Sequence, residues 1–114
     1  MFFSTLASGG DGGILASAHL RTDLFIEVFN QLQSNDHQGA LMVWRTLEPT
    51  IRLMFREANP MPVKYWLWRQ GLIHSPECRL PLSRISDSLV REIDLLTHDR
   101  NPRVLVGSPE LARA

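Results

Sequence analysis

The amino-acid sequence predicts a mostly α-helical single domain with one short β-strand. Its 114 residues are enough for one hydrophobic core. Apolar residues recur at helical spacing along residues 21–34 and 39–55, which is typical of helices that bury one face. Only residues 14–18 have the apolar, glycine-bounded character of a buried strand. We therefore expect about five helical segments and one strand.

The first twenty residues predict a helix end, a turn and the strand. Residues 1–8 are apolar and helical in pattern, and the glycine-rich segment 9–13 ends them. That segment lacks the residues of a phosphate-binding loop, so a tight turn is the preferred interpretation. A lone strand at 14–18 cannot pair its own backbone groups. Either its neighbours lie elsewhere, or the strand does not form.

Two longer helices follow. Residues 21–34 form an amphipathic pattern whose start Thr22 or Asp23 can cap. A polar link at 35–37 leads to a second pattern that begins at Gly39. Pro49 lies inside this second helix and should kink it, because proline removes one backbone hydrogen bond.

Prolines and glycines divide the remaining chain. Asn59 and Pro60 stop the second helix, and a short aromatic helix then runs from Val63 to Gln70 and ends at Gly71. We expect residues 79–82 to be extended, because proline restricts its predecessor. Ser83 or Ser86 can cap a final helix that ends near His98, and residues 99–114 show too little periodicity to assign.

Composition and charge exclude several classes of protein. With 44% hydrophobic and 21% charged residues, the chain has the composition of a folded protein. A formal net charge of zero gives no electrostatic reason to expect a nucleic acid or an anionic membrane as partner. No apolar run reaches the length of a membrane span, and the glycines interrupt any signal-peptide core. The single cysteine, Cys78, favours a reducing cytoplasm.

Four sequence segments resemble those of a known protein family. They are Gly9-Gly10-Asp11-Gly12-Gly13-Ile14, Phe55-Arg56-Glu57-Ala58-Asn59-Pro60-Met61-Pro62-Val63-Lys64, Gly71-Leu72-Ile73 and Arg79-Leu80-Pro81-Leu82. In this order the sequence resembles the C-terminal third of the dihydrodipicolinate synthase family, whose fold the N-acetylneuraminate lyase branch shares. The resemblance implies a C-terminal fragment of a (β/α)8 barrel. Residues 1–20 would be the end of a barrel helix, the glycine turn and the last strand, 21–98 the C-terminal helical region, and 99–114 a tail.

The resemblance also implies an activity for the intact family enzyme. These enzymes are class I aldolases that need no cofactor and bind pyruvate as a Schiff base on a lysine, and in the synthase branch the reaction leads to lysine. In the family's order, the strands with that lysine and the proton-relay tyrosine precede the part that this chain resembles. We therefore expect a partial 4-hydroxy-tetrahydrodipicolinate synthase-like protein that is inactive alone. Its expected partners are further copies or a polypeptide that supplies the missing barrel portion.

The same resemblance assigns few site residues. It implies that the main-chain carbonyl of Ile14 contacts the substrate, and it assigns no catalytic residue. Leu15 and His19 stand where the family usually has serine and asparagine, so a family member with a different pyruvate-derived substrate remains an alternative. The residues carried over as a structural motif are Asn59, Pro60, Pro62, Lys64, Arg79 and Pro81.

Several polar residues allow both a chemical and a structural interpretation. Lys64, the sole lysine, could be a nucleophile, but a structural role is preferred because the family places it outside the barrel mouth. Glu57 is expected to pair with an arginine, and Asn59 to bond the local turn. The histidines and Cys78 have no metal-ligand spacing, so no metal site is expected.

A different class of function was also considered, a small helical interaction module. We further expect poor stability of the isolated chain. The faces around Ile14, Phe25 and Trp66 should be partly unburied and promote association.

Overall fold

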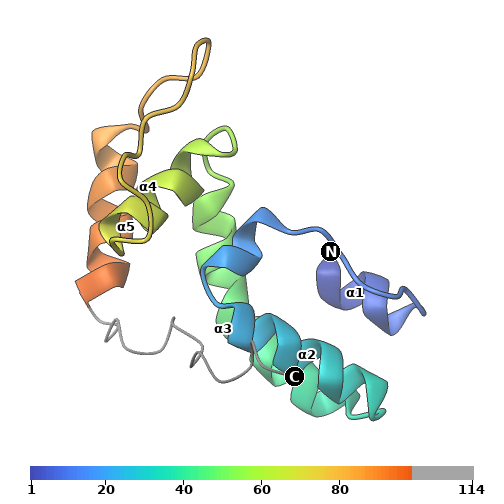
Figure 1. Cartoon of the computed structure of the whole chain (residues 1–114). Helices are drawn as coiled ribbons and strands as arrows, with labels where there is room; N and C mark the ends of the chain where they lie inside the picture. Colours follow the sequence, from blue (N-terminus) through green and yellow to red (C-terminus); the bar gives the residue numbers. More distant parts are fainter. Residues whose placement is uncertain (99–114) are drawn as a thin grey trace, which may run out of the picture.

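The computed structural model describes residues 1–98, and all regular secondary structure in this part of the chain is helical (Figure 1). The elements are α1 (Phe2–Ala7), a 3-10 helix η1 (Ala16–His19), α2 (Thr22–Gln33), α3 (His37–Met54), α4 (Met61–Arg69) and α5 (Asp87–His98). The mostly α fold class predicted from the sequence is confirmed. The expected tail, 99–114, lies outside the described residues.

Two hydrophobic clusters hold these helices together. The first, which we call the α2–α3 cluster, lies between α1, α2 and the N-terminal part of α3, and its buried members are Leu6, Phe25, Val28, Leu32, Ala40 and Leu47. The second, the α4–α5 cluster, lies at the other end of α3, and its buried members are Leu20, Leu53, Met54, Val63, Trp66, Ile85, Leu89 and Ile93. Figure 1 shows α3 running from one half to the other. Because α3 contributes buried residues to both clusters, it joins the two halves.

The helix ends follow the local chemistry of the sequence. Asp36 caps α3, because its carboxylate accepts a hydrogen bond from the Gly39 amide at 2.9 Å. Gly71 has φ +71°, the left-handed conformation that lets the chain leave α4. Ser86, one of the two predicted caps of the final helix, accepts from the Leu89 amide at 3.4 Å. Pro49 lies inside α3, which continues to Met54.

The predicted strand at 14–18 does not form. Residues 11–15 are irregular, residues 16–19 turn into η1, and the Ile14 side chain is fully exposed at 106%. A β-strand needs a neighbouring strand for its backbone hydrogen bonds, and residues 1–98 contain no second strand.

Two smaller expectations were wrong. Neither Thr22 nor Asp23 caps α2, because the Thr22 hydroxyl donates to the Ala18 carbonyl and Asp23 binds the Arg21 guanidinium at 2.6 Å. Residues 79–82 form a turn and not an extended segment, because the Leu82 amide donates to the Arg79 carbonyl at 3.1 Å.

The surface was also predicted only in part. Phe25 and Trp66 are themselves buried, with 5% and 1% of their surface exposed, but Phe25 lines an open cavity together with the exposed Ile14. None of the helices within residues 1–98 is long and apolar enough to cross a bilayer.

Candidate functional site

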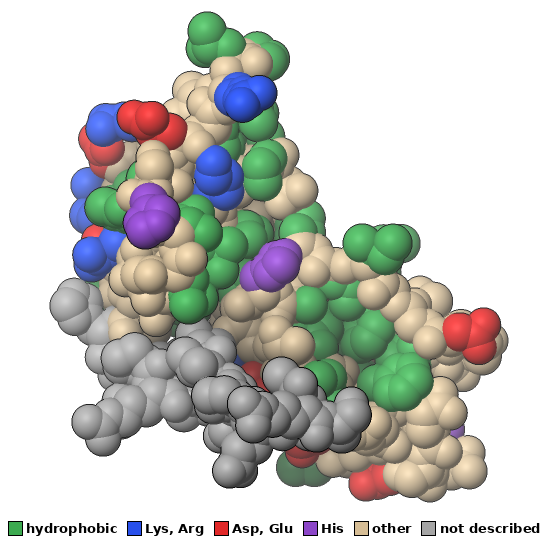
Figure 2. Space-filling view, viewed as in Figure 1, with side chains coloured by type: hydrophobic (Ala, Val, Ile, Leu, Met, Phe, Trp, Pro, Cys, Tyr) green, Lys and Arg blue, Asp and Glu red, His purple; other side chains and the backbone are tan. Residues whose placement is uncertain are grey.

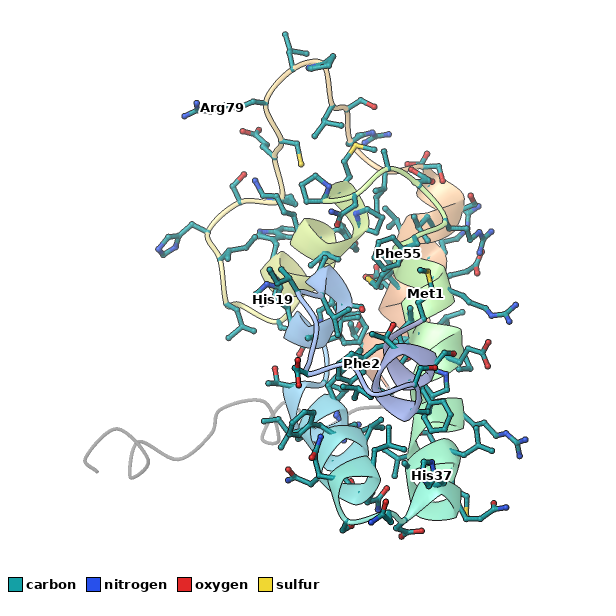
Figure 3. The ribbon with its side chains drawn as sticks, turned by 90° about the vertical axis from the view of Figure 1, so that its right-hand side faces the viewer. Met1, Phe2, His19, His37, Phe55 and Arg79 are labelled. Carbon is teal, nitrogen blue, oxygen red and sulfur yellow. The ribbon has the colours of Figure 1, made fainter. Side chains whose placement is uncertain are left out.

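A cavity lies beside the end of the glycine-rich segment, and we call it the N-terminal cavity. It has a volume of about 360 Å³. Its lining residues are Met1, Phe2, Ile14, Leu15, Ala16, Ser17, Phe25, Trp44, Ile51 and Phe55. Figure 3 shows Met1 and Phe55 close together at one end of it, with Phe2 below them. In Figure 2, hydrophobic side chains reach the surface over α1 and the segment before η1.

Packing on α1 positions the glycine-rich segment at this cavity. The Gly10 amide donates to the Thr5 carbonyl at 2.9 Å, which brings the chain back against the helix. A Cβ at Gly10 would lie 2.7 Å from Thr5 Cγ2 and 2.9 Å from the Thr5 carbonyl oxygen, so this close approach requires glycine. This contact fixes the point from which residues 11–15 continue to the cavity, which Ile14 and Leu15 line.

The main chain around Ile14 is unpaired within the described residues. Within residues 1–98, neither the amide nor the carbonyl of residues 11–14 has a hydrogen-bond partner. The carbonyl of Ile14 can therefore accept a hydrogen bond from a small molecule or from another polypeptide. This is the atom that the resemblance assigns to substrate contact, and its role stays a prediction.

Ser17 contributes a hydroxyl group to the cavity lining. The sequence alone did not single it out as a binding residue. It is 95% removed from solvent, since only 5% of its surface is exposed. Its only distinguishing feature in the sequence is that it is the one polar residue within the apolar run 14–18. His19, by contrast, is exposed and does not line the cavity.

Lys64 lies away from the N-terminal cavity. Its ammonium group donates a hydrogen bond to the main-chain carbonyl of Glu77, so it joins α4 to the loop between α4 and α5. Pro62 is buried beside it, whereas Asn59 is exposed. Arg79 and Pro81 are exposed at the turn in that loop, and Figure 3 shows Arg79 at its far end. The six motif residues thus surround α4 and the loop after it, and none lines the cavity.

Glu57 does not pair with an arginine, contrary to expectation. Its carboxylate oxygens each accept from the Ser86 amide at 3.2 Å, and one also accepts from the Ser86 hydroxyl. The neighbouring Arg56 pairs with Glu92 on α5 instead. Glu57 therefore fixes the start of α5 onto the corner that ends α3.

A second polar group joins α4 to α5. One oxygen of the Asp94 carboxylate accepts from the Tyr65 hydroxyl at 3.1 Å and from Arg69 Nε at 2.7 Å. Burial and this neighbouring carboxylate raise the pKa of the Tyr65 phenol above its ordinary value. These contacts hold the two helices together.

Residues 1–98 contain no group of three or more histidine, cysteine, aspartate or glutamate side chains that could hold a metal ion. The cavity lining itself is apolar apart from Ser17 and the main chain. Such a site can orient a small molecule by main-chain hydrogen bonds, but it offers no side-chain acid, base or nucleophilic amine.

Within residues 1–98 the helices thus leave one backbone segment unpaired beside an open, mainly apolar cavity. The sequence matches the dihydrodipicolinate synthetase family over residues 1–98. The chain belongs to this family.

Curated relatives agree with the family assignment. The 4-hydroxy-tetrahydrodipicolinate synthase 2 of Clostridium acetobutylicum is 48% identical over 93 residues, which are 82% of this chain and 32% of the relative. The 4-hydroxy-tetrahydrodipicolinate synthase of Rickettsia prowazekii is 38% identical over 87 residues, 76% of this chain and 29% of the relative. The chain spans about a third of the length of these relatives.

Solved structures agree as well. Dihydrodipicolinate synthase from Thermotoga maritima superposes with a TM-score of 0.80 at 31% identity, covering 86% of this chain and 33% of that one. A monomeric variant of dihydrodipicolinate synthase gives a TM-score of 0.79 at 30% identity, covering 92% of this chain and 34% of that one. The arrangement of helices is therefore that of the corresponding third of this enzyme.

Proposed function

We propose that this chain is a partial 4-hydroxy-tetrahydrodipicolinate synthase-like polypeptide that cannot form the pyruvate imine by itself. The observation that carries the proposal is the position of Lys64. As the only lysine it is the only side-chain amine, and its ammonium donates to the Glu77 carbonyl and not into the cavity beside Ile14. Imine formation needs an amine at the bound ketone, with loss of water.

In this proposal the chain supplies the substrate-contacting main chain and the helical support. Residues 1–20 correspond to the end of a barrel helix, the glycine turn and the last strand, and residues 21–98 to the C-terminal helical region, followed by a tail at 99–114. The Ile14 carbonyl contacts a pyruvate-class molecule once another polypeptide provides the remaining barrel and its lysine. The intact enzyme would act in the cytoplasm, on the route to lysine.

Borohydride reduction in the presence of pyruvate tests the proposal. Borohydride converts an imine into a stable secondary amine, so an adduct remains on the protein and can be located by peptide mass mapping. We expect no pyruvate adduct at Lys64 on this chain alone. The full-length Clostridium acetobutylicum relative, treated in parallel, is the positive control and should be labelled.

The site of any label decides the outcome. Mapping separates Lys64 from the amino group of Met1, which a mass of the whole chain would not do. A variant with Lys64→Arg keeps the positive charge and cannot form an imine. Labelling of Lys64 that disappears in this variant would contradict the proposal.

A further inference from the structure

Ser17 carries a buried hydroxyl group that has no hydrogen-bond partner within residues 1–98. In this part of the chain, the side-chain atoms that are both fully enclosed and unpartnered are Gln31 Oε1 and Trp66 Nε1. The Ser17 oxygen is not among them, so it is open to the N-terminal cavity, which Ser17 lines. A buried hydroxyl without a partner is unfavourable, and it therefore favours the binding of a polar atom in this cavity.

Three aromatic rings from three different helices form another part of the cavity lining. Phe2 of α1 lies with its ring centroid 5.5 Å from that of Phe25 on α2 and 6.3 Å from that of Trp44 on α3. The rings of Phe25 and Trp44 are 6.2 Å apart. Leu15 and Ile51 add aliphatic surface. An apolar molecule that entered the cavity would leave water and contact these rings. The volume of about 360 Å³ is typical of small-molecule sites.

The charge of the cavity lining restricts the kind of molecule further. None of the lining side chains is charged. The amino group of Met1 is the one charged group of the lining, and Met1 is 97% exposed, so this group stays in contact with water. Transfer of a carboxylate or an ammonium group from water to an apolar cavity is costly when no opposite charge compensates it. The cavity therefore favours an uncharged molecule.

We propose that the N-terminal cavity binds an uncharged, mainly apolar molecule, and that the Ser17 hydroxyl forms a hydrogen bond with an oxygen atom of this molecule. The aromatic rings would contact the apolar part, and Ser17 would act as a positioning residue for the end that carries the oxygen. The proposal goes beyond the proposed function, which assigns only the main-chain carbonyl of Ile14, and it does not depend on imine formation. The partner polypeptide of that function would lie against residues 11–15, so binding is tested on this chain without it.

Proton–nitrogen NMR spectra of the full 114-residue chain, titrated with benzyl alcohol, toluene or benzoate, test the proposal. These probes share one ring and differ in the hydroxyl group and the charge. Benzyl alcohol should shift the indole signal of Trp44 saturably, and benzoate should bind more weakly. Ser17→Ala should weaken the binding of benzyl alcohol by about 3–10-fold, the usual effect of one hydrogen bond, and change that of toluene by less than about twofold. Ser88→Ala is the matched control, because Ser88 is exposed on α5 and lines none of the described cavities, and it should change neither affinity.

A second comparison needs no variant, since the Ser17 amide of the unchanged chain should shift more with benzyl alcohol than with toluene. Circular dichroism should show unchanged helix content in Ser17→Ala. The absence of a saturable shift with benzyl alcohol would overturn the proposal, and so would tighter binding of benzoate. Equal weakening of benzyl alcohol and toluene by Ser17→Ala would overturn the role of the hydroxyl. Borohydride labelling of Lys64, by contrast, would contradict the proposed function and leave this inference intact.

Discussion

At the scale of single residues, Glu57 joins two elements that are distant in sequence. It accepts hydrogen bonds from the amide and hydroxyl of Ser86, 29 residues away. Ser86 in turn accepts from the Leu89 amide and so caps α5. A negative charge at the N-terminus of a helix is also favourable to the helix dipole. The position therefore orients α5 relative to the corner at 55–60.

We predict that Glu57→Gln lowers the free energy of unfolding by about 1 kcal/mol, because it removes the charge from these hydrogen bonds. Urea unfolding followed by circular dichroism measures the loss. Glu48→Gln is the control, since Glu48 forms only an exposed pair with Arg52 on the same helix. This control should change stability by less than about 0.5 kcal/mol. Equal effects of the two substitutions would contradict the assigned role of Glu57.

Tyr65 gives the α4–α5 contact a dependence on pH. Burial is the larger cause of its raised pKa, and the Asp94 carboxylate adds to it. The folded state therefore holds the phenolic proton more tightly than the unfolded state does. As the pH rises above about 10, unfolded chains lose this proton first, so stability falls until the folded phenol has ionised.

The predicted pH dependence can be measured on one group, because Tyr65 is the only tyrosine. An absorbance titration of tyrosinate should give a higher pKa in the folded chain than in urea. Asp94→Asn should lower the folded value, and Tyr65→Phe should remove this contribution to the loss of stability above pH 10. A folded pKa equal to that in urea would contradict the contact.

At the scale of elements, α5 is held by its buried face as much as by polar contacts. Leu89 and Ile93, one helical turn apart, are almost fully buried in the α4–α5 cluster, whereas Leu95 on the same helix is exposed. This arrangement follows from the spacing of apolar residues that the sequence already shows.

We predict that Ile93→Ala destabilises the chain by about 2–5 kcal/mol, because it leaves a cavity in this cluster. Leu95→Ala removes a similar volume from an exposed position and should change stability by less than about 0.5 kcal/mol. Thermal or urea unfolding distinguishes the two. Similar losses would mean that α5 does not pack through Ile93.

The helices could be predicted from the sequence because helix formation depends mainly on residues that are close in sequence. Periodic apolar residues located α2, α3 and α5 to within two residues, and Gly71 marked the end of α4. The strand could not be judged in this way, since pairing depends on residues that need not be near in sequence. The same limit explains Glu57, whose partner Ser86 lies beyond α4.

The candidate site was predictable only through the resemblance. Composition and spacing gave no reason to single out the Ile14 carbonyl, and the buried Ser17 in the cavity lining was found only in the structure. Lys64 does not line the cavity, and its partner, the main-chain carbonyl of Glu77, could not be predicted from the sequence.

At the scale of the whole molecule, two hydrophobic clusters share one long helix, and an unpaired segment lies at the edge of the first. The clusters account for the folding of residues 1–98 without any strand. Ile14 and Leu15 of the unpaired segment 11–15 line the N-terminal cavity. This is where the proposed partner polypeptide would bind. The central claim is therefore that the helices pack on one another within one chain while residues 11–15 remain unpaired within residues 1–98.

Hydrogen exchange of the dilute chain, followed by mass spectrometry, tests this claim most directly. Amides inside α2, α3, α4 and α5 should exchange slowly, because their hydrogen bonds open only on unfolding. Amides of residues 11–15 should exchange as fast as those of an unstructured peptide. Slow exchange at residues 11–15 in the monomer, or fast exchange throughout the helices, would contradict the account.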